Sequence, residues 1–172
     1  TRELSLDETA GEFLADLADD GATLLSRTLS DIQAGTAEAT PQSGEPTWAP
    51  KLTSRLVKID PAQPAEAVRG LINGASPAPG AWGILELGGT QAARFKIGRA
   101  RPVSEAVETS KQPGEFILES DRVLLVCQDG VIELIEVQPS GKKMMRAIDW
   151  ARGVENTLRM HTSVTHPDEF TR

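Results

Sequence analysis

The sequence has few aromatic residues, one cysteine and no long apolar run. Its 172 residues include four Phe, three Trp, no Tyr and one Cys. With so few aromatics, a core must depend mainly on Leu, Ile, Val and Ala, which suits a small domain. No apolar run approaches the roughly 20 residues that a membrane span needs, and no charged-then-apolar signal segment opens the chain. We therefore expect a cytoplasmic protein with no membrane partner.

The single cysteine, Cys127, lies at the end of an apolar run that starts at Val123. It has no intramolecular disulfide partner, which fits a reducing compartment. A small buried side chain is the expected role here, in preference to a catalytic thiol.

The sequence also lacks the residue clusters on which catalysis depends. His161 and His166 lie in a polar segment near the end of the sequence, far from any Ser or Cys that apolar residues flank. There is no zinc-ligand cluster, phosphate-cradling glycine motif or nucleophile-base pair. Asp129 belongs to an Asp-Gly turn, which explains it without chemistry. We predict no catalytic residue, no metal site and no bound cofactor in this chain.

Positive charge is scarce overall but unevenly placed. The net charge is −7, yet residues 1–50 carry two basic and ten acidic side chains, whereas residues 51–152 carry fourteen basic and twelve acidic ones. Binding to a polyanion depends on where the positive charge lies and not on the sum over the chain. The middle of the chain can therefore still bind RNA.

Residues 1–35 predict a helical arm, and residues 36–52 predict an extended linker. Thr9 and Glu12 have the spacing of a capping box, and leucines at three- and four-residue intervals follow. Gly21 is expected to divide this stretch into two helices. The linker contains three prolines and no apolar periodicity, and Trp48 is expected to pin it to a domain surface.

Residues 53–153 predict a barrel-like β domain, and residues 154–172 a loose tail. One helix should begin near Pro64, and an Asp-Gly turn should join two of the strands that follow. Five short strands with a flanking helix most economically form an OB-like barrel, and an open five-stranded sheet is the alternative. The fold class is thus mainly β with flanking helices. The expected strands are Ala81 to Leu87, Arg94 to Ile97, Phe116 to Leu118, Arg122 to Cys127 and Val131 to Val137.

A cationic turn is the main candidate for function. Lys142 and Lys143 follow Gly141 in a tight turn after the last strand, and Arg146 lies close behind them. Such side chains can each meet a phosphate and add salt-dependent affinity without reading base sequence; an ordinary solvated turn is the alternative. A second basic cluster comprises Arg94, Lys96, Arg99 and Arg101, and Lys51 at the end of the linker is a third candidate contact.

Several short motifs follow one another along the chain. They are Asp7-Glu8-Thr9-Ala10-Gly11-Glu12, Gly35-Thr36, Thr40-Pro41-Gln42, Thr47-Trp48-Ala49-Pro50-Lys51-Leu52, Ile59-Asp60, Pro77-Ala78-Pro79-Gly80-Ala81-Trp82, Asp129-Gly130 and Gln138-Pro139-Ser140-Gly141-Lys142-Lys143-Met144. In this order and spacing they resemble the C-terminal portion of methionyl-tRNA formyltransferases, over about residues 3–153. The Gln-Pro-x-Gly-Lys-Lys turn is the most specific of them.

The resemblance implies a parent enzyme that formylates initiator methionyl-tRNA with 10-formyltetrahydrofolate as donor. The catalytic Asn, His and Asp and the folate site of that family lie in an N-terminal domain whose motifs do not occur here. Residues 1–35 would be the remnant of that domain, and residues 53–153 the OB-like tRNA-binding domain of a monomer. The resemblance assigns tRNA contacts to Lys51, Lys142 and Lys143, with Arg146 beside them and Arg99 and Arg101 as further candidates.

The chain departs from the family pattern at three aromatic positions. Trp48 stands where the family usually has Tyr, and Pro61 and Ala78 stand where it has Trp. Two alternatives stay open. The same C-terminal domain also follows formyltransferase domains that act on sugar nucleotides or folate, and the chain could instead be a stand-alone barrel whose helical arm docks on a protein partner.

Overall fold

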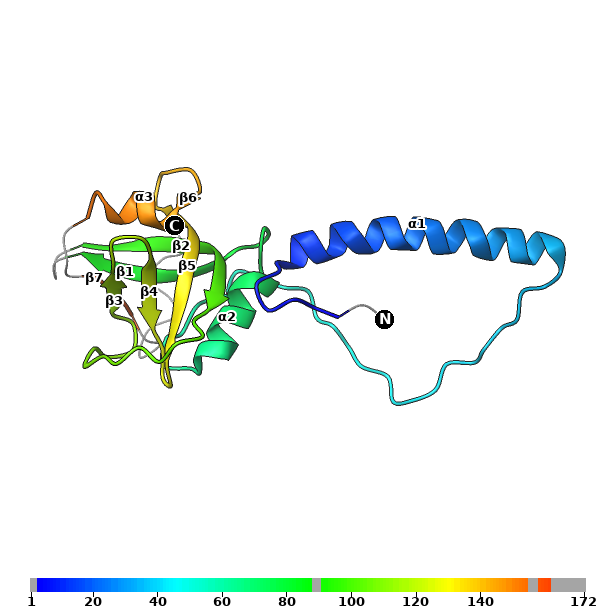
Figure 1. Ribbon diagram of the computed structural model, residues 1–172, viewed down its shortest axis with the longest axis horizontal. Coiled ribbons are helices and arrows are strands. Elements are labelled where there is room, and N and C mark those ends of the chain that lie inside the picture. Colours follow the sequence, from blue (N-terminus) through cyan, green and yellow to red (C-terminus); the bar gives the residue numbers. More distant parts are fainter. Residues whose placement is uncertain (1–2, 88–90, 155–157, 162–172) are drawn as a thin grey trace. The chain divides into compact units, whose positions relative to one another are not determined.

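The structure is a computed structural model that describes residues 3–87, 91–154 and 158–161. It divides into two compact units, and Figure 1 labels their elements. One unit comprises Thr1–Ala10 and Leu52–Arg172, and the other is Gly11–Lys51. We describe each unit by itself.

Helix α1 (Ala10–Ala34) runs through Gly21 without a break, so the predicted division into two helices is wrong. A glycine inside a helix costs only about 1 kcal/mol relative to alanine, and the good helix formers on both sides of it outweigh that cost. None of the residues of α1 is buried. Its apolar side chains are largely exposed, among them Leu14, Leu24, Leu25, Leu29 and Ile32.

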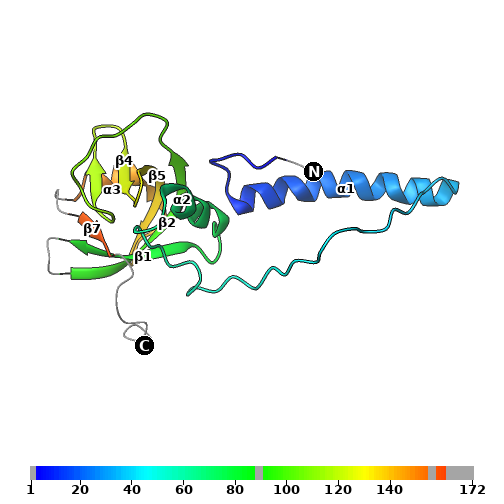
Figure 2. The same ribbon diagram turned by 90° about the horizontal axis from the view of Figure 1, so that it is seen from below.

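The larger unit is built on an antiparallel β-sheet. Its strands run in the order β3 (Phe116–Leu118), β4 (Val123–Val126), β5 (Val131–Pro139), β2 (Gln91–Pro102), β1 (Ala81–Leu87) and β7 (Leu158–Met160), and β6 (Met145–Arg146) pairs with β5. Figures 1 and 2 show how this sheet curls around one core. The fold is the predicted OB-like barrel with flanking helices, although the described residues form seven strands where the sequence indicated five.

The sheet nearly closes where β7 meets the residues just before β3. The N–H of Met160, in β7, donates to the carbonyl of Gly114 at 2.7 Å, and the N–H of Gly114 donates to the carbonyl of Val126 in β4 at 2.9 Å. Strand β7 was not predicted and lies in the segment expected to be a loose tail. The three residues of β7 lie in a mostly polar segment and are too few to predict a strand from the sequence. They form a strand because they pair with β1.

The core concentrates three of the scarce aromatic side chains in one place. The ring of Phe95 lies 4.7 Å from the ring of Trp150 and 6.3 Å from that of Phe116, centroid to centroid. Aliphatic side chains of β2, β4 and β5 surround them. Cys127 belongs to this core, and burial raises the pKa of its thiol to about 12. The thiol is therefore protonated and uncharged at neutral pH. Cys127 packs as a small apolar side chain, as the sequence predicted.

Two short helices cover the barrel. Helix α2 (Ala65–Gly74) packs mainly against β2 and buries Val68 and Ile72, whereas α3 (Ala147–Ala151) contributes Trp150 to the core. The buried side chain of Asn73 joins α2 to β2: its amide accepts the N–H of Ala100 at 2.9 Å and donates to the carbonyl of the same residue at 2.8 Å. Among the described residues, no helix is long and apolar enough to cross a membrane.

Asp129 caps the N-terminus of α2 in addition to forming the Asp-Gly turn. Its carboxylate accepts the N–H of Ala65, the first residue of α2, at 2.7 Å. We expect Asp129→Ala to lower the free energy of unfolding by about 1 kcal/mol, because that N–H loses its cap and the helix N-terminus loses a favourable charge. Urea unfolding checks this value. Asp129→Asn keeps a capping oxygen and should retain most of the stability; an equal loss in both variants would contradict the capping role.

Candidate nucleic-acid interface

The turn that carries Lys142 and Lys143, the lysine turn, lies between β5 and β6 and is held by one backbone and one side-chain hydrogen bond. The N–H of Lys142 donates to the carbonyl of Pro139 at 3.0 Å, and the side-chain amide of Gln138 donates to the carbonyl of Lys142 at 2.8 Å. Gly141 adopts a φ of 72°, a left-handed conformation that a glycine accepts at no steric cost. Lys142 and Lys143 are both exposed on this ordered turn.

Met144 ties the same turn to the sheet. Its methyl group lies over Gly98 of β2, only 2.8 Å from where a Cβ on that glycine would stand. A side chain at position 98 would displace the end of the Met144 side chain. The residue that follows the two lysines thus packs on β2.

Arg146 has a partner of its own. Its guanidinium contacts both oxygens of Asp149, at 2.7 and 2.9 Å, and Arg152 contacts the same carboxylate at 3.0 Å. The hydrogen bond from Arg146 holds the pKa of Asp149 below its ordinary value, and the same contact raises the pKa of Arg146. Any anion that approached Arg146 would therefore compete with Asp149 for its guanidinium. Its predicted RNA contact stays a prediction.

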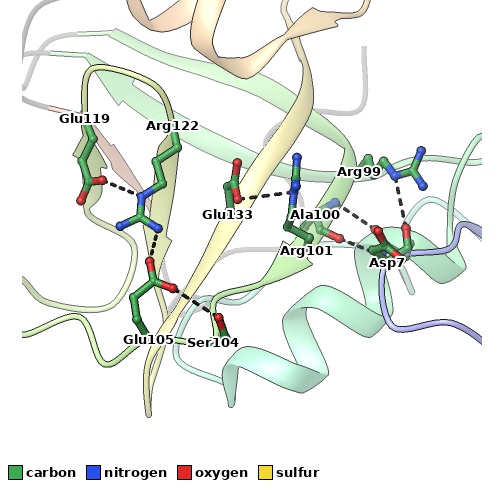
Figure 3. A network of polar contacts seen from close by, with 10 residues as sticks. Asp7, Arg99, Ala100, Arg101, Ser104, Glu105, Glu119, Arg122 and Glu133 are labelled. Atoms are coloured by element: carbon green, nitrogen blue, oxygen red, sulfur yellow. Dashed lines mark hydrogen bonds and ion pairs between the residues drawn. The ribbon is translucent and has the colours of Figure 1, made fainter.

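The arginines at the far end of β2 are also engaged within the chain (Figure 3). Arg101 forms an ion pair with Glu133 on β5 at 3.4 Å, and Nε of Arg99 donates to the carbonyl of Asp7 at 3.2 Å. Glu133 is the cross-strand neighbour of Arg101, so the sheet register itself makes this pair. The roles predicted for Arg99 and Arg101 in RNA binding stay predictions.

Arg122 stands at the centre of the other contacts in Figure 3. Its guanidinium pairs with Glu119 at 2.5 Å and also with Glu105, and Ser104 donates to the same Glu105 at 3.4 Å. The hydrogen bond from Arg122 lowers the pKa of Glu105. These charges are satisfied locally, which removes them from the candidate interface.

Lys51 is exposed at the end of the smaller unit, and its contact with RNA stays a prediction. His161, one of the two histidines, donates its backbone N–H to Ile84 at 2.9 Å, and its ring lies 3.2 Å from Glu86. His166 lies outside the described residues. Within the described parts of the chain, no group of His, Cys, Asp and Glu is arranged to hold a metal ion.

The structure adds to the second basic cluster a ring contact that the sequence did not reveal, at the outer face of β1 and β2. The guanidinium of Arg94 lies over the indole of Trp82 at 4.2 Å from the ring centroid, and the ammonium of Lys58 lies 5.9 Å from it. Ser54 holds both Trp82 and Arg94. Its carbonyl accepts the indole N–H of Trp82 at 2.7 Å, and its hydroxyl accepts a hydrogen bond from the guanidinium of Arg94 at 2.8 Å. The alternation of Arg94 and Lys96 with hydrophobes was a visible signal, but the contact with Trp82 was not.

Comparison with families of known proteins gives one match that covers most of the barrel unit. Residues 51–155 match the model of the formyl transferase C-terminal domain. Two curated relatives are methionyl-tRNA formyltransferases. That of Leifsonia xyli is 45% identical over 147 residues, and that of Corynebacterium diphtheriae is 46% identical over 150 residues. These alignments cover 86% and 87% of this chain but 46% of each relative. The chain thus spans about half the length of the relatives it matches.

Solved structures with a similar fold include HypX from Aquifex aeolicus. One variant of it matches with a TM-score of 0.64 and 19% identity, over 89% of this chain and 28% of that one. A HypX structure in complex with tetrahydrofolic acid matches with a TM-score of 0.52 and 21% identity, over 71% of this chain and 21% of that one. At this identity the likeness concerns the fold alone.

Proposed function

The chain belongs to the formyl transferase C-terminal domain family, matching the C-terminal portion of methionyl-tRNA formyltransferases, and on that premise we propose that it holds initiator tRNA without catalysing formyl transfer. The parent enzyme would formylate the methionyl group carried by that tRNA, with 10-formyltetrahydrofolate as donor. The donor and the catalytic residues would bind and act in the half of the relatives that this chain does not span.

The lysine turn is the observation that carries the proposal. Lys142 and Lys143 are exposed, stand on an ordered turn, and form no ion pair with any carboxylate among the residues the structure describes. A fixed pair of cations can neutralise neighbouring phosphates of a folded RNA and release the counterions condensed there. Recognition of this kind follows the shape and backbone of the RNA, which suits a chain with few aromatic residues for stacking bases.

Helix α1 fits a role at the junction with the rest of the parent. It buries none of its side chains, although its leucines fall on one face at helical spacing. An apolar stripe of this length is normally covered. We assign the cover to the N-terminal catalytic domain, because the relatives are about twice as long as this chain.

A binding and turnover assay tests the proposed function. The chain alone is mixed with charged initiator tRNA and formyl donor, with a full-length methionyl-tRNA formyltransferase as the positive control. We expect a gel shift with tRNA that weakens as salt rises, and no formylation above a buffer blank. Turnover by the chain alone would overturn the claim of inactivity, and the absence of any salt-sensitive shift would overturn the claim of binding.

A parent acting on a sugar nucleotide or on folate predicts a different result in the same assay. Such a chain would have no reason to prefer tRNA to a random single-stranded RNA of equal length. The relatives named above favour the tRNA parent, since both are methionyl-tRNA formyltransferases. Reading the coding sequence upstream of Thr1 would separate these parents, because the loops that bind donor and acceptor would lie in the half of the relatives that this chain does not span.

A further inference from the structure

A row of residues crosses the outer face of the barrel and ends at the lysine turn. Lys58 bridges to Trp82 of β1, Trp82 pairs with Lys96 of β2, and Lys96 pairs with Gln138 of β5. Directly paired residues in a sheet project from the same face. The neighbours of these residues along the strands are buried, so the row faces outward. Gln138 then donates to the carbonyl of Lys142 at 2.8 Å, which joins the row to the turn.

We propose that Arg94, stacked on Trp82, is a second phosphate-binding site for RNA, continuous with the lysine turn through Lys96. This inference rests on the proposed function. It adds to that function a definite path for the RNA backbone, across β1, β2 and β5 on the outer face of the barrel. The residues that define the path are Lys58, Trp82, Arg94, Lys96, Lys142 and Lys143.

The geometry around Arg94 favours a phosphate ligand. The indole face at 4.2 Å and the hydroxyl of Ser54 at 2.8 Å hold the guanidinium in one orientation, although the side chain is exposed. A guanidinium that is stacked on a ring keeps its N–H edge available, and that edge matches two oxygens of a phosphate. Holding the side chain in place beforehand reduces the entropy that binding would otherwise cost.

The charges near Arg94 are also available. In the described parts of the chain, no carboxylate forms an ion pair with Arg94, Lys58 or Lys96. This distinguishes the start of β2 from its end, where Arg101 is paired with Glu133. A purely structural role, in which Arg94 only fastens Ser54 to the sheet, would require the hydrogen bond and the stacking but would gain nothing from an unpaired charge.

Affinity for initiator tRNA, measured at several salt concentrations, tests the inference with three variants. Arg94→Ala should bind about five- to tenfold more weakly at moderate salt and lose roughly 0.7–0.9 from the log–log salt slope, as expected for one lost phosphate contact. Arg94→Lys keeps the charge but not the planar edge, so it should lose affinity with little change in slope. Ser54→Ala should also weaken binding with the slope unchanged, because it frees the guanidinium without removing it.

Lys111→Ala is the matched control, since it removes one exposed cation from the loop beyond the other end of β2. It should bind tRNA as the unaltered chain does. If all three variants bind normally while Lys142→Ala/Lys143→Ala binds weakly, the second site is wrong and the proposed function stands. If the unaltered chain shows no salt-dependent binding, the proposed function itself has failed. Circular dichroism of each variant separates lost binding from lost folding.

Discussion

Replacing Lys142 and Lys143 together with alanine is expected to reduce tRNA affinity by more than an order of magnitude at moderate salt. Each lysine that neutralises a phosphate contributes roughly 0.7–0.9 to the slope of log affinity against log salt, so losing both should flatten it by roughly 1.4–1.8. The effect should be large because the turn is preorganised by Gln138 and Met144. Fluorescence anisotropy with labelled initiator tRNA measures both quantities.

The double arginine variant Lys142→Arg/Lys143→Arg is the control for charge. It keeps both cations and should retain the slope, because counterion release depends on charge more than on the identity of the donor. A slope that is unchanged in the alanine variant would remove the role assigned to the turn. A slope that falls equally in both variants would show that the turn had changed shape, and would not count as the loss of two phosphate contacts.

Asn73→Ala is expected to cost the barrel about 3 kcal/mol of unfolding free energy. Its amide satisfies both the N–H and the carbonyl of Ala100, in the part of β2 where the pairing with β5 shifts register. Asn73 and Ala100 are both buried, so the substitution leaves two backbone groups without partners and without water, and each such group costs roughly 1–3 kcal/mol. Urea unfolding followed by circular dichroism gives the value.

Gly70→Ala on the same helix is the matched control. Gly70 is exposed and has nothing within 4 Å of the position of a Cβ. Alanine there should stabilise α2 by up to about 1 kcal/mol, the reverse of the effect at Asn73. If Asn73→Ala lost no more than about 1 kcal/mol, a water would have to replace the amide, and the bridge to Ala100 would not be what fixes α2 to β2.

Much of the barrel could be predicted from local sequence patterns. Strand β3 and the hairpin of β4 and β5 follow from short apolar runs and an Asp-Gly turn, whose signals lie within a few residues. Strand β7 could not be predicted, because Leu158–Met160 becomes a strand only by pairing with β1, more than 70 residues earlier. The helix break predicted at Gly21 was wrong for the opposite reason. A glycine does lower the stability of a helix, but this loss is smaller than the helix propensity of the residues around it.

The candidate site shows the same division between local and distant information. The lysine turn was visible because its cations are adjacent in the chain. The pairing of Arg101 with Glu133 depends on sheet register, and the bond from Arg99 to Asp7 joins residues 92 positions apart. Neither could be derived from spacing. The ion pair of Arg146 and Asp149 is different. Opposite charges three residues apart in a helix often pair, so this contact could have been predicted from the sequence.

The most direct test of RNA binding by the barrel is a map of amide chemical shifts in the ¹⁵N-labelled chain during titration with initiator tRNA. We expect the largest changes at Lys142 and Lys143, at Arg94 and Lys96, and at the indole N–H of Trp82. The amides of Arg122 and Glu105 should move little. Changes centred on Arg122 and Glu105, with the turn and the Trp82 indole unaffected, would place the RNA elsewhere and contradict the assignment of this surface.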